Sequence, residues 1–452
     1  MHLIEYCPVI EEVDSRSKSD VAEAIGPDGC GSAGSFVEGR LYALFMLYIV
    51  YALNFLDRQI LSILIEPIKL EFQFSDTQLG FLTGLAFAMF YATLGVPIAR
   101  AADRHSRRNI IAICLAIWSA MTVFCGLANN FLQMTLARFG VAVGEAGCVA
   151  PAQSMLADYF PERLRGRGMA VFASAIYLGI LVGLAFGGWV SDNFGWRAAF
   201  FMAGAPGILL AIIFIATVRE PARGEAEFAP DTVTRASFSA DLGALLKRPT
   251  FVWIAVGLGA QSMAGYGLMT WLPSFYRRFH DVSIAQAGFS LSLIIGFGGL
   301  LGALIGGWLS DALAKKNNRW YLWISAIAAF VCIPFFLGAL FVSQTDLSFI
   351  FLTVAMFIGA VHSGPLYAAM LGVLEPQRRA VGTAVMLFAN NLIGIGLGSL
   401  FVGVMSDFFA SIGQSDPLRY SMIASLIFLL VASLSMFMGS AFQSRDWISA
   451  NK

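Results

Sequence analysis

Four charged side chains lie inside stretches of the chain that are otherwise apolar. Asp57 and Arg58 are neighbours in one stretch, and Arg138 and Glu145 lie seven residues apart in another. Residues seven apart share one face of a helix, two turns from each other. Each such charge costs about 2.5–3.5 kcal/mol near the centre of a bilayer. We therefore expect these residues to have a task in a water-filled cavity.

The two arginines and the two carboxylates suit different tasks. Arg58 and Arg138 stay charged, and their forked donors can hold a phosphate or a carboxylate. Asp57 and Glu145, if they lie in a partly dry cavity, bind protons more readily and can carry them. An anionic substrate on the arginines would favour protonation of a neighbouring carboxylate, which is a route to coupling. The alternative is a structural ion pair, either Asp57 with Arg138 or Arg58 with Glu145.

The elements that position these charges are predicted to be membrane-spanning helices. The chain is 58% hydrophobic and 13% charged, whereas a soluble protein carries about a quarter charged residues. Twelve apolar stretches have about the 20 residues that a spanning helix needs. They are centred on Leu41–Ile65, Leu79–Ala101, Ile110–Ala128, Phe131–Leu156, Met169–Val190, Ala198–Val218, Phe251–Tyr276, Ala287–Leu309, Trp320–Val342, Phe349–Val373, Thr383–Met405 and Met422–Phe442.

The two halves of the chain repeat each other. The sequence from Ser75 to Phe81 returns as the sequence from Ser283 to Phe289, at a shift of 208 positions. Ser191-Asp192 matches Ser406-Asp407 at a similar shift. Two related membrane-embedded halves around one central space are typical of carriers that alternate access. We predict an all-α fold of two six-helix bundles, at 41–218 and 249–442, joined by a linker at 219–248 and flanked by tails at 1–40 and 443–452.

The distribution of positive charge predicts the orientation in the membrane. Loops after even-numbered helices hold seventeen Lys and Arg, and loops after odd-numbered helices hold five. Loops rich in Lys and Arg stay in the cytoplasm. Both termini, the linker and the even loops are therefore expected to be cytoplasmic, in a multi-pass protein of the cell inner or plasma membrane. The net charge of zero gives no attraction to nucleic acid.

The second half supplies neutral polar groups where the first supplies charges. Among the histidines, His362 lies within an apolar span. The sequence offers no second metal ligand at helical spacing from it, so we expect no metal site there. Its side chain is either a structural imidazole held by hydrogen bonds or a proton relay. Asn390 cross-links helices or contacts substrate, and Tyr367 is a further candidate contact. An amphipathic ligand would place its head group on the charged half and its tail against the other. No phosphate-binding loop of an ATP-driven pump is present, and no cofactor is expected.

The loops after helices two and eight identify a family. The run Ala99-Arg100-Ala101-Ala102-Asp103-Arg104-His105-Ser106-Arg107-Arg108 resembles the signature loop of the major facilitator superfamily, and Gly307-Trp308-Leu309-Ser310-Asp311 resembles its second copy. In one interpretation these charges only fix topology. In the other they form a cytoplasmic latch that holds the outward-facing state and opens in the inward-facing state. The latch residues are Asp103, Arg104, Arg107, Arg108 and Asp311.

Two shorter motifs are similar to the Spinster family within that superfamily. They are Asn54-Phe55-Leu56-Asp57-Arg58 and the run from Arg138 to Val143-Gly144-Glu145-Ala146. Spinster members export lysolipids, including lysophospholipids and sphingosine-1-phosphate, and some are proton-coupled. The resemblance implies that Asp57, Arg58, Arg138 and Glu145 line the substrate cavity.

The sequence thus predicts a monomeric, proton-linked secondary carrier of an amphipathic anion such as a lysolipid, embedded in membrane lipid. A carrier of small organic anions, sugar acids or drugs is the alternative within this class. A membrane enzyme that modifies lipids, with Glu145 or His362 as acid or base, is the alternative of another class, although no nucleophile, histidine and carboxylate set is visible.

Overall fold

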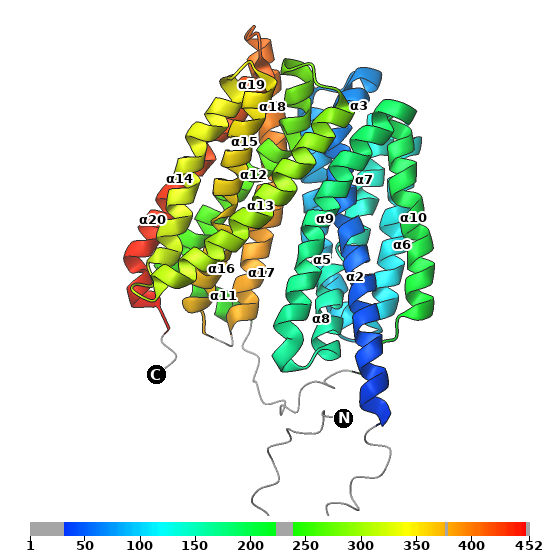
Figure 1. Cartoon of the computed structure of the whole chain (residues 1–452), viewed down its shortest axis with the longest axis vertical. Helices are drawn as coiled ribbons and strands as arrows, with labels where there is room; N and C mark the ends of the chain where they lie inside the picture. Colours follow the sequence, from blue (N-terminus) through cyan, green and yellow to red (C-terminus); the bar gives the residue numbers. More distant parts are fainter. Residues whose placement is uncertain (1–30, 223–237, 376–377, 449–452) are drawn as a thin grey trace, which may run out of the picture.

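The computed structural model describes residues 31–222, 238–375 and 378–448. Every regular element within these ranges is a helix. The tails expected at 1–40 and 443–452 and the linker expected at 219–248 lie partly outside the described residues. Figure 1 shows the helices in two groups side by side, with the start of α2 (Gly31–Ile63) and the end of α20 (Ile427–Asp446) at the same end of the molecule, which is the end of the described termini.

The first group, the N-bundle, begins with a long helix that carries Asp57 and Arg58. Its elements are α2 (Gly31–Ile63), α3 (Ile65–Phe72), α4 (Asp76–Gly80), η2 (Phe81–Leu85), α5 (Ala86–Ala102), α6 (Arg107–Leu127), α7 (Phe131–Glu145), α8 (Val149–Tyr159), α9 (Glu162–Phe194) and α10 (Trp196–Thr217). The segments α4, η2 and α5 form one continuous span with a π-helical turn in it.

The second group, the C-bundle, follows a short helix at the end that holds both termini (Figure 1). That short helix is α11 (Phe238–Leu246). The bundle consists of α12 (Pro249–Phe279), α13 (Ile284–Ala314), α14 (Trp320–Phe341), α15 (Thr345–Ala360), α16 (Ser363–Gly372), α17 (Arg379–Phe388), η4 (Ala389–Leu397), α18 (Gly398–Ser411), α19 (Pro417–Ser425) and α20 (Ile427–Asp446).

The twelve predicted spans are present, and the fourth is split into two helices that are each too short to count as a span. Eleven helices in the described ranges are long and apolar enough to cross a membrane. The expected span Phe131–Leu156 is instead two helices, because α7 ends at Glu145 and α8 begins at Val149. Pro151 contributes to this break, since proline cannot donate to the carbonyl four residues earlier. The fold class predicted from the sequence, twelve helices in two bundles, is confirmed.

The internal repeat is visible in the same irregularities. The tenth span is divided between α15 and α16, shortly before Pro365, as the fourth is divided before Pro151. Ser75 and Ser283 each cap the helix that follows by accepting a hydrogen bond from the third residue on. Glu145 and His362 consequently stand next to equivalent interruptions in the two bundles.

The bundles contact each other most closely towards the end opposite the termini, which we call the distal end. Helix α9 packs against α13, and the η2 segment packs against α18 and η4. A Cβ atom at Gly188 would lie 2.6 Å from the carbonyl oxygen of Ile284, and one at Gly80 would lie 2.6 Å from that of Ser399. Glycine therefore permits two backbones to meet at both crossings.

Candidate functional site

The centre of the N-bundle holds a buried ion pair between α2 and α7. Arg58 donates from Nε to Oε2 of Glu145 at 2.7 Å. The Arg58 side chain is 12% exposed, whereas the Glu145 side chain is fully buried. Of the two ion pairs that the sequence allowed, this one is formed. Glu145 is the last residue of α7, so the break in the fourth span lies directly beside the pair.

Asp57 points to a different helix from its neighbour. Its Oδ2 accepts a hydrogen bond from the hydroxyl of Thr122, on α6, at 2.9 Å. Successive residues on a helix are about 100° apart, which explains why Asp57 meets α6 while Arg58 meets α7. Arg138 lies within electrostatic range of Asp57 and of Glu145. No ion pair within 4.0 Å joins Arg138 to Asp57 in the described part of the chain.

Aromatic rings enclose the two arginines. The guanidinium carbon of Arg58 lies 5.0 Å from the ring centre of Phe55, 4.9 Å from that of Phe87 and 4.7 Å from that of Tyr91. Phe87 also faces Arg138, at 5.6 Å. These rings attract the cations and keep bulk water from them. Sequence reasoning missed Thr122, Phe87 and Tyr91, because nothing distinguishes them among many similar side chains in apolar spans.

Several buried polar atoms of this charged cluster have bonding capacity left over. Within the described chain, Asp57 Oδ1, Arg58 Nη2 and Arg138 Nε have no hydrogen-bond partner. Buried polar groups in proteins are otherwise almost all paired. The charged cluster can therefore rearrange its hydrogen bonds, or bind a proton or an anion, without first breaking all of its existing hydrogen bonds.

A cavity of 310 Å³ lies between the two bundles, next to the charged cluster. Phe55 and Gln59 of α2 line it on one side, flanking Arg58 in the sequence. The C-bundle lines it with neutral polar groups and apolar side chains, and the polar ones are Gln261, Ser262, Tyr266, His362, Ser363 and Asn390. None of the four charged residues expected to line the substrate cavity belongs to this lining. Arg58 contacts the cavity wall through Phe55, whose ring centre lies 5.0 Å from the guanidinium carbon.

The predicted contacts of the second half fall into two groups. His362 and Asn390 line the cavity. His362 makes a ring-nitrogen contact of 2.5 Å with the carbonyl of Gly359, and Asn390 accepts a bond from Ser262 at 2.7 Å. Tyr367 does not belong to the cavity lining; it borders a separate small pocket with Leu366 and is 42% exposed. No group of three His, Cys, Asp or Glu side chains that could hold a metal occurs among the residues described.

The predicted latch residues lie at the end that holds the termini. Asp103 and Arg104 are exposed, and Asp311 accepts a long bond of 3.4 Å from Tyr321 of its own bundle. Arg107 is buried and binds Asp158 and Glu220, the latter at 2.9 Å. Burial opposes ionisation of Glu220, but bonds from Arg107, Arg108 and Ser106 hold its pKa below the usual value. In the described part of the chain, the bonds of Arg107 and Arg108 stay on the N-bundle side and that of Asp311 stays in the C-bundle.

A second set of charges, which we call the distal clamp, joins the bundles at the distal end. It consists of Asp76, Arg278, Asp192 and Asp407. Arg278 of the C-bundle binds both carboxylate oxygens of Asp76 of the N-bundle, at 2.7 and 2.8 Å. Lys69 and Ser406 also contact Asp76, at 2.5 and 2.6 Å. Asp76 thus receives bonds from both bundles while it is only 3% exposed.

The repeat places the other two clamp residues in equivalent positions. Asp407 accepts hydrogen bonds from the backbone N–H groups of Asp76 and Thr77, at 3.1 and 2.8 Å. Asp192 accepts one from the backbone N–H of Ala285, at 2.8 Å. Each aspartate therefore neutralises the positive end of a helix in the opposite bundle. The paired Ser-Asp motifs were visible in the sequence, but nothing in them indicated contact across the bundles.

Comparison with known proteins places this geometry in context. Residues 47–399 match the model of the Major Facilitator Superfamily. An MFS-type efflux pump of Mycolicibacterium smegmatis is 34% identical, over 87% of this chain and 90% of that protein. Protein spinster homolog 1 of Xenopus laevis is 26% identical, over 88% of this chain and 79% of that protein.

A solved structure is similar over nearly the whole fold. It is a bacterial homolog of the human lysosomal transporter Spinster, in an inward-facing and unoccupied conformation. The TM-score is 0.84 and the identity 32%, with 91% of this chain and 99% of that chain covered.

Proposed function

The chain belongs to the major facilitator superfamily, and on that premise we propose that it is a proton-coupled carrier of an amphipathic anion such as a lysolipid or a sphingosine-1-phosphate-like molecule. It is a multi-pass membrane transporter that resembles Spinster proteins, and not an enzyme. The observation that carries the proposal is the buried Arg58–Glu145 pair, with 2.7 Å between the bonded atoms, in contact with Phe55 of the wall of a cavity that no Asp, Glu, Lys or Arg lines.

The cavity and the pair suit the two ends of such a ligand. Arg58 is the most exposed of the four charged residues, and its neighbours Phe55 and Gln59 line the cavity. A phosphate or carboxylate head group would bind Arg58, with Arg138 as the second cation. The tail would lie against apolar side chains of the lining, such as Ile180, Leu268 and Met356. Asn390 and His362 offer hydrogen bonds to hydroxyl groups between head and tail.

Proton coupling would follow because Glu145 and the anionic head group of the substrate compete for Arg58. In this structure Glu145 accepts a bond from Arg58, and a neighbouring cation favours the ionised form of a carboxylate. An anionic head group that takes Arg58 leaves Glu145 buried with less positive charge beside it. A buried carboxylate without a cation binds a proton, because burial of an unpaired charge is costly. Substrate and proton would therefore bind together, and Asp57, held by Thr122, is the second possible proton carrier.

The distal clamp supports a conformation that is closed at one end. If the Lys- and Arg-rich loops are cytoplasmic, the distal end is the outer face and the clamp closes the outer entrance. The latch of Asp103, Arg104, Arg107, Arg108 and Asp311 would then form only when the cytoplasmic ends of the bundles meet. The solved bacterial relative is in an inward-facing conformation, which agrees with this proposal.

Weakening the distal clamp should shift the protein toward a state that is open at the distal end. We expect Asp192→Asn with Asp407→Asn to shift that equilibrium roughly threefold or more, since each charge at a helix N-terminus contributes about 0.3–1 kcal/mol. The distance between spin labels on the exposed residues Asn129 and Gln414, one on each bundle, reports the shift. Asp281→Asn is the matched control, because Asp281 lies at the same end and its side chain is 94% exposed. An unchanged distance distribution in the double variant would show that Asp192 and Asp407 do not hold the bundles together.

Counterflow in proteoliposomes tests the proposed function. Vesicles loaded with unlabelled lysophosphatidylglycerol should take up labelled lysophosphatidylglycerol and keep it chemically intact. Uptake should saturate and should be faster with a pH gradient. Counterflow with glucarate or with a drug, but none with the lysolipid, would favour the alternative carrier of small anions, sugar acids or drugs.

A further inference from the structure

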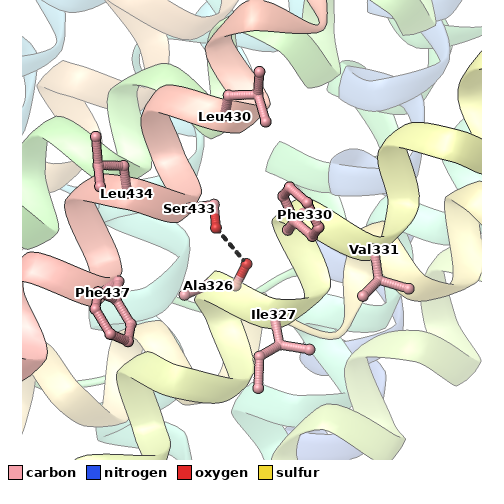
Figure 2. A pocket seen from close by; sticks show the side chains of 8 residues that line it. All are labelled: Ala326, Ile327, Phe330, Val331, Leu430, Ser433, Leu434 and Phe437. Atoms are coloured by element: carbon pink, nitrogen blue, oxygen red, sulfur yellow. Dashed lines mark hydrogen bonds between the residues drawn. The ribbon is translucent and has the colours of Figure 1, made fainter.

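The outer flank of the C-bundle carries a long apolar groove between α14 and α20. The groove has a volume of 480 Å³, and Figure 2 shows side chains from both helices facing it, among them Phe330, Leu434 and Phe437. These three side chains are 58–59% exposed. Ser433 is the polar side chain in the lining, and its hydroxyl donates to the carbonyl of Ala326 at 2.8 Å. The groove therefore suits an occupant that is apolar along this length.

The groove lies apart from the transport cavity. Figure 1 shows α14 and α20 together at the edge of the molecule furthest from the N-bundle. None of the residues that line the groove lines the central cavity. Because the helices span a membrane, this flank faces lipid, and the natural occupant is an acyl chain.

Positive charge marks one end of the groove. Arg319 stands immediately before α14, and Arg445 lies in the last turn of α20. Each is seven or eight residues from the groove lining, or about 10–12 Å along its helix. Arg319 donates from Nε to Ser444 at 3.1 Å, which ties the two helix ends together. Lys315 and Lys316 are exposed in the preceding turn.

The remaining groups at this end are compatible with a lipid head group. Arg445 is 64% exposed, and its contact with Asp446, at 3.2 Å, uses only Nε. Asp446 is itself engaged by the hydroxyl of Thr250 at 2.8 Å. Trp320 and Trp323 lie edge to face at 5.2 Å at the same level. Tryptophan is enriched where a membrane meets water, so these rings place the arginines at head-group depth.

We propose that this groove binds one acyl chain of an anionic glycerophospholipid whose phosphate is held by Arg319 and Arg445. Guanidinium groups bind phosphate oxygens through paired, charge-assisted hydrogen bonds. Basic pockets between membrane helices at a cytoplasmic face are typical sites for anionic head groups. The inference stands independently of the transported substrate, since it concerns a different surface of the protein.

Photo-crosslinking tests the proposal. The full-length protein is placed in vesicles that contain phosphatidylglycerol or phosphatidylcholine carrying the same diazirine-labelled acyl chain. We expect phosphatidylglycerol to label peptides of α14 and α20 roughly fivefold more than phosphatidylcholine does. Arg319→Gln with Arg445→Gln should remove this preference. Arg163→Gln with Arg167→Gln, two exposed arginines of the N-bundle at the same end, is the matched control and should keep it.

A second variant separates the groove from the head-group site. Ser433→Phe fills the middle of the groove and should lower labelling of α14 and α20 by both lipids, while transport counterflow stays unchanged. Equal labelling by the two lipids in the unaltered protein would overturn the proposal, because it would indicate annular lipid only. Cross-links between the α14–α20 surfaces of two chains would also overturn it, since the occupant would then be a second copy of the protein.

Discussion

Glu145→Gln and Asp57→Asn should each reduce pH-driven accumulation of lysophosphatidylglycerol, and the variant that removes the proton carrier should reduce it to the level of vesicles without protein. An amide cannot take up a proton, although it keeps the shape of the carboxylate. Glutamine at 145 can still accept the bond from Arg58, and asparagine at 57 can still accept the bond from Thr122. Exchange of substrate down its own gradient should therefore survive in part.

The comparison of driven accumulation with exchange makes this prediction specific. A variant that is merely misfolded loses both activities, whereas an uncoupled variant loses only the first. Thermal unfolding of each purified variant provides the control for folding. If both variants accumulated substrate against its gradient as well as the unaltered protein, neither carboxylate would be the proton carrier.

Arg58→Ala should have the largest effect on stability of any single change in the cluster. It leaves the fully buried Glu145 without its cation, and breaking one side of a buried ion pair costs about 3–5 kcal/mol. It also removes the cation nearest the cavity, so binding of lysophosphatidylglycerol should weaken at least tenfold. Arg58→Lys keeps the charge but not the forked donors, and should recover stability better than affinity. Scanning fluorimetry and equilibrium binding measure the two effects.

A double-mutant cycle distinguishes the ion pair from loss of packing. Adding Glu145→Gln to Arg58→Ala removes the unpaired charge and should restore much of the lost stability. Arg138→Ala is the matched comparison, because Arg138 is more deeply buried than Arg58, at 2% exposed, but makes no ion pair within 4.0 Å in the described chain. It should weaken anion binding with a smaller loss of stability. Strictly additive effects in the cycle, or unchanged affinity in both arginine variants, would contradict the assignment of the head-group site.

The sequence located the spans well, because hydropathy and the repeat act over many residues at once. It could not show the break after Glu145, which depends on the local combination of Pro151 with the packing of one helix against its neighbours. It also could not decide between Asp57 and Arg58 as the partner of α7. That choice depends on how α2 is rotated relative to α6 and α7, and hydropathy leaves this rotation undetermined.

The same limit explains the site residues that differ from expectation. Asn390 and His362 line the cavity, whereas Tyr367 borders a separate pocket beside Leu366 and Met370. Thr122 and Phe87 are positioned by long-range packing that no local pattern records. The distal clamp joins Asp76 to Asp407, which are 331 positions apart, and only the assembled fold brings them together.

Proton uptake on substrate binding tests the central claim most directly. Lysophosphatidylglycerol is added to the purified protein in weakly buffered solution while the pH of the medium is followed. We predict uptake of up to one proton for each lysolipid bound, and no uptake in whichever of Glu145→Gln and Asp57→Asn removes the carrier. Binding without any change of pH in the unaltered protein would contradict the account, because head group and carboxylate would then not share an arginine.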